Sequence, residues 1–169
     1  MKEISFRDDI LPLKDRLFRL ALSITLDRAD AEDVVQDTLI RVWNKRDEWA
    51  QIDSIEAYTL TVCRHLALDL NAKAGRQNLP LDESRDEAPA ERTPYEELDA
   101  RQRLDIVKKL IDSLPETQRT IMELRDVEGK SYKDIADILQ LSEDRVKVYL
   151  FRARQKVKMQ FSKIEEYGL

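Results

Sequence analysis

The side chains best suited to bind a ligand lie near the C-terminal end, in the segment SEDRVKVYLFRARQKVK. At about 100° per residue, basic residues gather around two apolar ones on one face of a helix. The residues of this face are Asp144, Arg145, Lys147, Val148, Phe151 and Arg152, with Gln155 and Lys158 beyond them. Arg and Lys bind phosphates or guanine edges, and an outward Phe or Val contacts a thymine methyl. The face suits a DNA groove; the alternative is a solvated charged helix with one exposed aromatic.

Two short helices are expected to position this face. Ser131 with Asp134 is typical of one helix start, and Ser142 followed by two acids is typical of a second. Only Gln140 and Leu141 lie between the two helices. Apolar residues recur at three- and four-residue spacing in both, at Tyr132, Ile135, Ala136 and Leu139 and at Val146, Leu150, Ala153 and Val157. Two apolar stripes that meet across a tight turn predict a helix-turn-helix.

A second candidate surface belongs to the segment ADAEDVVQDTLIRVWNKRDEW, which we expect to be a helix capped by Asp30. The helical period turns Asp33, Gln36, Asp37 and Ile40 away from its apolar stripe. Acids in a first turn are ordinarily partners of the helix dipole. Asp37 lies beyond that turn and shares its face with an exposed Ile. This combination favours docking against a basic partner surface.

The next helix is predicted to begin at Ser54, after a short loop from Trp49 to Asp53, and to end at Gly75. His65 and Asp69 fall at the rim of its apolar stripe, with Arg64 and Lys73 open to solvent. A lone His beside an apolar face is usually structural. Trp residues, including Trp49, are likewise more often core residues than ligand-stacking ones.

The inventory of reactive groups argues against an enzyme. The chain has one Cys and one His, Cys63 and His65, too few for a disulfide framework or a tetrahedral zinc site. It carries no Gly-rich phosphate loop and no nucleophile–base pair, so we expect no catalytic residue, no metal and no cofactor. No apolar run approaches the roughly 20 residues of a membrane span, and the N-terminus is too polar for a signal peptide. These features predict a cytoplasmic protein without direct membrane insertion.

Composition and charge indicate two domains separated by a linker. Strand signals are missing, which favours an all-α fold of two small helical domains. The formal net charge is −5, yet residues 99–169 carry fifteen basic and thirteen acidic side chains. The basic charge is therefore local, and an acidic remainder would bind DNA weakly without a larger partner. We expect domains at 1–75 and 95–164, an acidic, proline-containing linker at 76–94 and an unordered tail at 165–169.

Two further helix starts complete the expected elements. A first core helix covers Phe6 to Leu26, with Pro12 in its first turn. Thr93, Pro94 and Glu96 predict the start of a fourth helix that ends near Asp112, and a fifth follows from Ser113.

At these residues the chain resembles the extracytoplasmic-function (ECF) sigma factors of bacterial RNA polymerase. DAEDVVQDTLIRVW is similar to region 2.2 of that family, and AYTLTVCRHLALD to regions 2.3 and 2.4. The stretch from SLPETQRTIMEL to FRARQKV resembles the whole of region 4. Region 4 alone would be ambiguous, because many regulators end in a similar helix-turn-helix. The acidic region 2.2 match at the right distance upstream makes the resemblance specific.

The resemblance implies a promoter-recognition subunit, and it implies a role for each group of residues. Asp33, Gln36, Asp37 and Ile40 would bind the clamp helices of the polymerase β′ subunit, and region 4 would meet the β flap. Residues that would read and melt the minus-10 element are Trp49, Ser54, Arg64, His65, Asp69 and Lys73. Residues that would meet the minus-35 element are Asp144, Arg145, Lys147, Val148, Phe151 and Arg152. An anti-sigma factor is the regulatory partner that the family implies.

The chain departs from the family at two places. His65 stands where members usually have Asn, and the pair Asp144–Arg145 replaces the common Gly-Thr. The base preference at either promoter element therefore does not follow from the resemblance. The alternative function is a dimeric helix-turn-helix regulator that binds operators without core polymerase.

Overall fold

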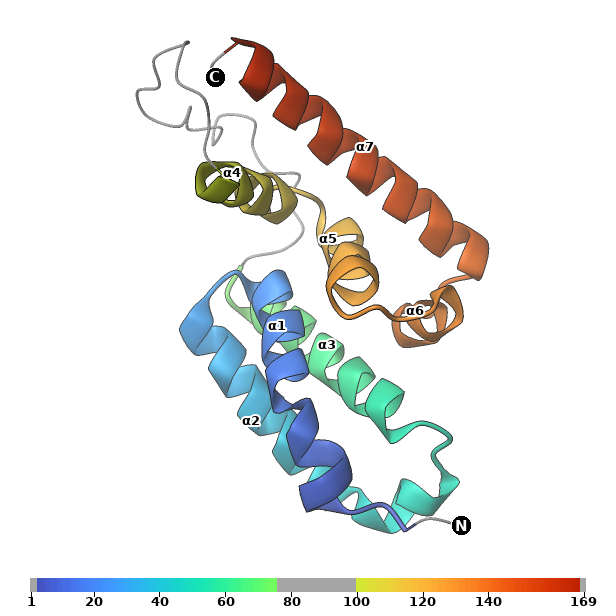
Figure 1. Cartoon of the computed structure of the whole chain (residues 1–169). Helices are drawn as coiled ribbons and strands as arrows, with labels where there is room; N and C mark the ends of the chain where they lie inside the picture. Colours follow the sequence, from blue (N-terminus) through green and yellow to red (C-terminus); the bar gives the residue numbers. More distant parts are fainter. Residues whose placement is uncertain (1–2, 76–99, 168–169) are drawn as a thin grey trace.

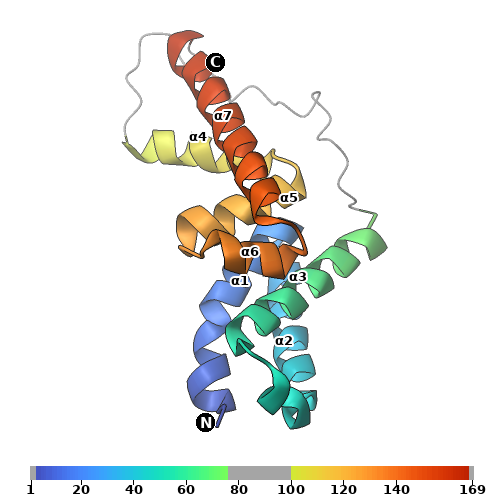
Figure 2. The same ribbon diagram turned by 90° about the vertical axis from the view of Figure 1, so that its right-hand side faces the viewer.

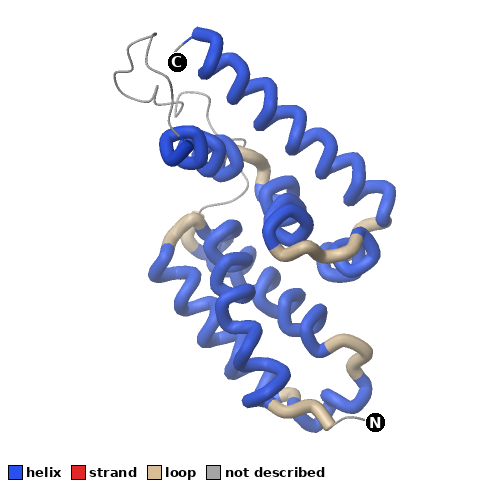
Figure 3. The backbone as a smooth tube through the Cα atoms, in the orientation of Figure 1, coloured by secondary structure: helices blue, strands red, loops and turns tan. Residues whose placement is uncertain are grey.

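The structure, a computed structural model, describes residues 3–75 and 100–167. All regular elements of these two ranges are helical, joined by short loops (Figure 3). The predicted linker at 76–94 and the predicted cap at Thr93, Pro94 and Glu96 lie outside the described residues. None of the described helices is long and apolar enough to cross a membrane.

The front module comprises the elements up to residue 73, and its helices α1, α2 and α3 pack against one another (Figure 1). Its elements are the π-helical turn η1 (Phe6–Ile10), the 3-10 turn η2 (Leu11–Leu13), α1 (Lys14–Thr25), α2 (Arg28–Asn44), the 3-10 turn η3 (Arg46–Gln51) and α3 (Ile55–Lys73). The predicted first helix is therefore divided, with Pro12 in η2, where the missing N–H costs no helical hydrogen bond.

The cap of α2 corrects the sequence prediction. Asp27, not Asp30, is the N-cap, and its carboxylate accepts a hydrogen bond from the Asp30 backbone N–H at 2.9 Å. Asp30 lies in the first turn, where an acid complements the helix dipole. The cap at Ser54 is confirmed, because its hydroxyl accepts from the Ala57 N–H, and Gly75 follows α3 with a φ of 74°. That left-handed conformation suits a glycine.

The rear module comprises the elements from residue 100 onward. They are α4 (Ala100–Asp112), α5 (Glu116–Met122), the π-helical turn η5 (Glu123–Val127), α6 (Tyr132–Leu139) and α7 (Glu143–Tyr167). Both predicted Ser caps are present: Ser131 accepts from the Asp134 N–H at 3.1 Å and Ser142 from the Arg145 N–H at 3.2 Å. Gln140 takes a left-handed φ of 57° in the turn between the two helices. The helix-turn-helix of α6 and α7 is therefore confirmed.

The predicted unordered tail is wrong as far as residue 167, because α7 continues to Tyr167. Phe161 and Ile164 extend its apolar stripe and are half-buried. Arg103 of α4 pairs with Glu165 at 3.6 Å between Nε and Oε1. The last turns of α7 remain helical because they pack against α4, whereas a free helix end has no such contact.

The two modules share one apolar core. Buried side chains of α1 and α3 belong to the same cluster as those of α5, α6 and α7, with α6 lying across α3 (Figure 2). The largest fully buried members include Leu17, Leu20, Leu60, Ile121, Leu124, Ile135 and Leu150. A smaller core of Ile10, Val42 and Trp49 lies at the other end of the front module. Burial of each Leu or Ile stabilises the fold by about 1.5–3 kcal/mol, so the modules contribute to each other's stability.

Glu123 is a half-buried acid near the contact between the modules. One of its carboxylate oxygens is buried without a hydrogen-bond partner among the described residues. Burial, together with the nearby Glu128 carboxylate, raises the pKa of Glu123 to about 7, although Arg19 opposes the shift. The unfolded chain ionises near the ordinary value of 4.5. Glu123 therefore destabilises the folded chain increasingly as the pH rises from 4.5 to 7, and fully above 7.

We predict that Glu123→Gln raises the free energy of unfolding by about 2 kcal/mol at pH 8 and much less at pH 5. Urea unfolding of the full chain at both pH values measures the difference. Glu166→Gln, which removes an exposed carboxylate of α7, is the control and should leave the pH dependence close to that of the original chain. Equal pH slopes for the original chain and Glu123→Gln would contradict the assignment.

Candidate functional site

The first half of α7 presents the predicted DNA-reading face. Val146, Leu150, Ala153 and Val157 are buried against the rest of the module. Because a helix turns by about 100° per residue, the opposite face is held outward. Every predicted residue of that face is exposed: Asp144, Arg145, Lys147, Val148, Phe151 and Arg152. Phe151 keeps 63 % and Val148 46 % of their surfaces accessible, so the face offers apolar contact among its charges.

The surroundings of this face stiffen it and leave its charges outward. The Lys147 ammonium lies 5.4 Å from the centre of the Tyr132 ring, and the Arg125 guanidinium lies 4.3 Å from the same ring. Arg154 pairs with Asp126 of η5. Arg145 and Arg152 form no ion pair with any residue that the structure describes, so their guanidinium groups project into solvent. A rigid helix face with two such cations and an exposed Phe can enter the major groove.

The outward face of α2 belongs to the front module. Asp33, Gln36, Asp37 and Ile40 are exposed, as predicted, while Val34, Val35 and Thr38 are buried behind them. Ile40 is 59 % accessible, and the neighbouring Trp43 is 44 % accessible. Two acids beside an exposed Ile and Trp can bind a partner that combines basic and apolar groups.

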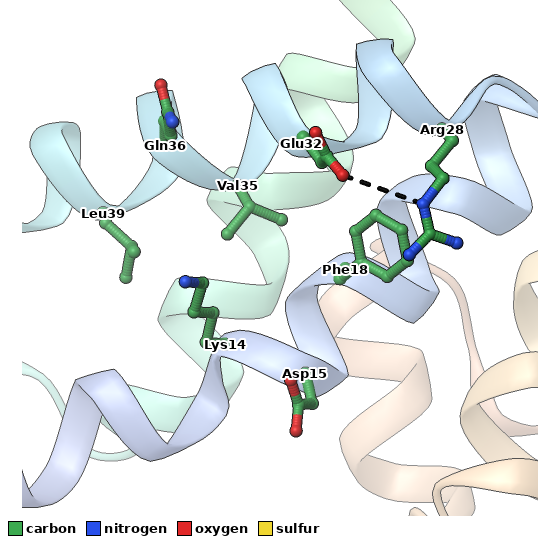
Figure 4. A pocket seen from close by; sticks show the side chains of 8 residues that line it. All are labelled: Lys14, Asp15, Phe18, Arg28, Glu32, Val35, Gln36 and Leu39. Carbon is green, nitrogen blue, oxygen red and sulfur yellow. Dashed lines mark ion pairs between the residues drawn. The ribbon is translucent and has the colours of Figure 1, made fainter.

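Beside this face an open depression of about 430 Å³ lies between α1 and α2 (Figure 4). Its lining comprises Lys14, Asp15, Phe18, Arg28, Glu32, Val35, Gln36 and Leu39. Arg28 pairs with Glu32 at 3.8 Å and lies over the Phe18 ring at 5.2 Å. Because the depression is open and its lining mixes charged and apolar side chains, it is better suited to extend a docking surface than to enclose a small molecule.

Of the residues predicted to bind the melted minus-10 strand, the structure exposes some and buries others. Ser54 caps α3, and His65, Asp69 and Lys73 are exposed along it. Trp49 is not on a loop: it lies in η3, is 8 % accessible, and its indole N–H donates to the Val42 carbonyl at 3.0 Å. The apolar contacts of Ile10 and Val42 bury the ring. Trp49 can therefore support this segment but cannot stack on a base in this conformation.

Arg64 also departs from the sequence prediction of a solvent-exposed side chain. Its side chain is 13 % accessible, and its guanidinium pairs with the Glu116 carboxylate of α5 at 3.3 Å. The helical period predicts an outward Arg64 from its own helix alone, and this prediction is wrong. The rear module covers that face, which only the tertiary structure decides.

Cys63, the single cysteine, lies in the shared core. Burial raises the pKa of its thiol to about 12, so the nucleophilic thiolate is absent at neutral pH. His65 lies outside the shared core and is exposed.

Two residues central to the module contact were not identified from the sequence. Arg119 and Glu116 are 6 % and 2 % accessible, although charged residues are expected on the surface. Periodicity assigns a charge to the outside of its own helix and carries no information on a second module that covers it.

Family models match both modules. Sigma-70 region 2 matches residues 10–77, and Sigma-70, region 4 matches residues 104–157. The ECF RNA polymerase sigma factor SigL of Mycobacterium tuberculosis is 30% identical over 144 residues, which cover 85% of this chain and 81% of SigL. EcfG of Rhodopseudomonas palustris is 31% identical over 159 residues, covering 90% and 83% of the two chains.

SigE of Mycolicibacterium smegmatis is 33% identical over 147 residues, or 85% of this chain, which spans only 56% of SigE. Among solved structures, the sigma factor RpoE from Bartonella quintana, co-crystallised with the anti-sigma factor NepR, superposes with a TM-score of 0.70 at 27% identity. That match covers 95% of this chain and 98% of RpoE, so it includes both modules. On these matches, the chain belongs to the ECF sigma factors of the sigma-70 family of RNA polymerase.

Proposed function

We propose that this chain is the promoter-specificity subunit of a bacterial RNA polymerase: it binds the core enzyme through its front module and recognises promoter DNA with both modules. The observation that carries the proposal is the separation of two exposed surfaces of opposite character. One is the acidic and apolar face of α2, and the other is the basic and apolar face of α7. Neither surface brings together groups that could perform bond chemistry.

The α2 face is assigned to the core polymerase. Asp33 and Asp37 provide charge attraction to a basic partner, while Gln36 and Ile40 provide hydrogen-bonding and apolar contact. By the family resemblance, the partner is the pair of clamp helices of β′, and the β flap meets the rear module. The net charge of −5 supports this division, because an acidic chain binds DNA poorly unless the polymerase holds it there.

The α7 face is assigned to duplex DNA at the minus-35 element. Arg145, Lys147 and Arg152 would contact phosphates or guanine edges, and Val148 and Phe151 would contact thymine methyl groups. Asp144, in the first turn of α7, can accept a hydrogen bond from a cytosine amino group.

The exposed part of α3 and its preceding segment are assigned to the melted minus-10 strand. Ser54, His65, Asp69 and Lys73 offer hydrogen-bonding groups and charges on one module. Trp49 acts indirectly, because its buried ring and its bond to Val42 fix the segment that leads to Ser54. Arg64 would join this set once Glu116 releases it.

An ordinary dimeric helix-turn-helix regulator explains less of the chain. Such a protein needs only the rear module, and the region 2 match over residues 10–77 would have no purpose. Restraint by an anti-sigma factor is the regulation we propose, since the similar RpoE structure was solved with the anti-sigma factor NepR.

Transcription with purified core polymerase tests the proposal as a whole. The full chain should co-purify with the core enzyme and direct run-off transcripts from a subset of genomic fragments. A chain that forms a stable dimer, binds DNA tightly alone and ignores the core enzyme would establish the regulator instead.

We predict that Asp37→Arg weakens binding to core polymerase about tenfold or more, because a cation replaces an acid at a surface that faces a basic partner. Titration of labelled core enzyme with the variant measures the affinity. Circular dichroism should show an unchanged helical content, since Asp37 is exposed. Asp8→Arg, the same charge reversal on η1 of the front module, should bind normally. Normal binding by Asp37→Arg would remove α2 from the polymerase interface.

We predict that Arg152→Ala weakens promoter binding by the holoenzyme. If Arg152 contacts a phosphate, the loss is uniform across promoters and the salt slope falls by about 1. If it contacts a guanine, discrimination at one minus-35 position falls by about 1–3 kcal/mol. Binding to a set of single-base promoter variants at several salt concentrations separates these outcomes. Arg101→Ala on α4 is the control, and an unchanged promoter affinity for Arg152→Ala would exclude both roles.

A further inference from the structure

The first turn of α7 carries an acid and a base side by side at the end of the helix that lies beside α6 (Figure 1). The Ser142 hydroxyl accepts a hydrogen bond from the Arg145 N–H at 3.2 Å, and the Ser142 carbonyl accepts from the Val146 N–H at 3.1 Å. These two bonds fix the backbone of Glu143, Asp144 and Arg145. The directions in which their side chains leave the helix are therefore set before any DNA is bound.

Asp144 lies at the centre of the outward face of α7. Val148 and Phe151 follow it by four and seven residues, so both fall within about 40° of it around the helix axis. All three side chains are exposed, while Val146 lies on the opposite, buried side. Four residues of helix span only about 6 Å. A duplex that contacts Val148 therefore also meets the Asp144 carboxylate.

A carboxylate at this position restricts which duplex can approach. Within residues 3–75 and 100–167, no cation pairs with Asp144. An ionised carboxylate only accepts hydrogen bonds, and guanine and the thymine O4 offer only acceptors in the major groove. The donors in that groove are the amino groups of cytosine and adenine. Asp144 therefore disfavours most base edges and accepts from an amino group.

Arg145 narrows the amino donor to cytosine. Its exposed side chain leaves the helix about 100° from Asp144, on the edge that Arg152 shares. An arginine binds the O6 and N7 atoms of guanine with two hydrogen bonds, and an A·T pair offers no such pair of acceptors. Cytosine and guanine occur together in every G·C pair. One G·C pair, or two adjacent ones, can thus satisfy Asp144 and Arg145 at once.

The helix dipole explains an acid in this turn but not its place on the face. Glu143 and Asp144 both lie in the first turn of α7, where either carboxylate complements the dipole. Glu143 leaves the helix about 100° away from Asp144, on the edge of Lys147. Glu143 can therefore complement the dipole from the edge, whereas Asp144 occupies the centre of the surface that faces DNA.

We propose that Asp144 and Arg145 are the specificity-determining pair of α7: they require a G·C pair in the minus-35 element, with the cytosine amino group toward Asp144 and the guanine edge toward Arg145. Asp144 acts mainly by exclusion, because its negative charge lowers the affinity for every duplex that lacks the cytosine. The inference rests on the proposed function, since it requires α7 to lie in the major groove of the promoter.

Selection of duplex fragments by the holoenzyme tests the pair. Fragments are randomised over the minus-35 region and selected with purified core polymerase and the full chain. The original chain should select one fixed C·G pair. Asp144→Gly should reduce the preference for that pair about tenfold and should bind the other fragments more tightly.

Glu143→Gly is the matched control, because it introduces the same residue one position earlier in the same turn. It should select the same base pair as the original chain. Circular dichroism should show equal helical content in both variants, since both side chains are exposed. An identical selected sequence for the original chain and Asp144→Gly would overturn the inference.

Two modified bases at the selected pair test each contact separately. N4-methylcytosine still pairs with guanine but carries a methyl group where the free N–H projected into the groove. 7-Deazaguanine still pairs with cytosine but lacks N7. Each should weaken binding of the original holoenzyme about tenfold. Asp144→Gly should respond only to 7-deazaguanine, and Arg145→Ala only to N4-methylcytosine. Unchanged binding of the original holoenzyme to either modified fragment would overturn the corresponding contact.

The two levels of failure are distinguishable. A holoenzyme that selects a minus-35 sequence without dependence on Asp144 would overturn this inference and leave the proposed function standing. A chain that does not join core polymerase, or a holoenzyme that selects no base pair in the minus-35 region, would overturn the proposed function and the inference with it.

Discussion

The helix α3 contributes buried apolar side chains to a core that both modules share. Leu60, Cys63 and Ala67 belong to the same cluster as Ile121 and Ile135 of the rear module. Because this cluster spans both modules, the position of the helix-turn-helix is coupled to the packing of α3. Burial of apolar area fixes the direction of the exposed faces of α2 and α7, because each face lies opposite the side chains buried behind it.

The charged side chains fall into two groups, one exposed and one buried between the modules. Exposed charges, such as those of Asp37 and Arg152, lie on the outward faces of α2 and α7. The charges of Arg119 and Glu116 are buried in the contact between modules, where removal of a partner is costly. Ion pairs of this kind give a contact specificity more than strength. The contact between the modules therefore combines a shared apolar core with specific charged pairs.

The α7 face and the segment before α3 differ in how they are supported. The α7 face stands on a helix whose other side is buried, so the backbone positions that carry its exposed side chains are fixed. The segment before α3 depends on Trp49, whose ring fills the small core with Ile10 and Val42. The ring of Trp43 meets those of Phe6 and Trp49 edge to face, at 5.4 and 6.2 Å between centroids. These aromatic contacts stiffen the end of the front module that leads to Ser54.

The sequence by itself determined the all-helical class, the caps at Ser54, Ser131 and Ser142, and the outward faces of α2 and α7, because these depend on local hydrogen bonds and on a period of 3.6 residues. Only the tertiary structure decided that Trp49 packs with Ile10 and Val42, that α7 extends to Tyr167 and that Arg64 is paired with Glu116. Each of these depends on a partner distant in sequence, and periodicity carries no information about which distant segment covers a given face.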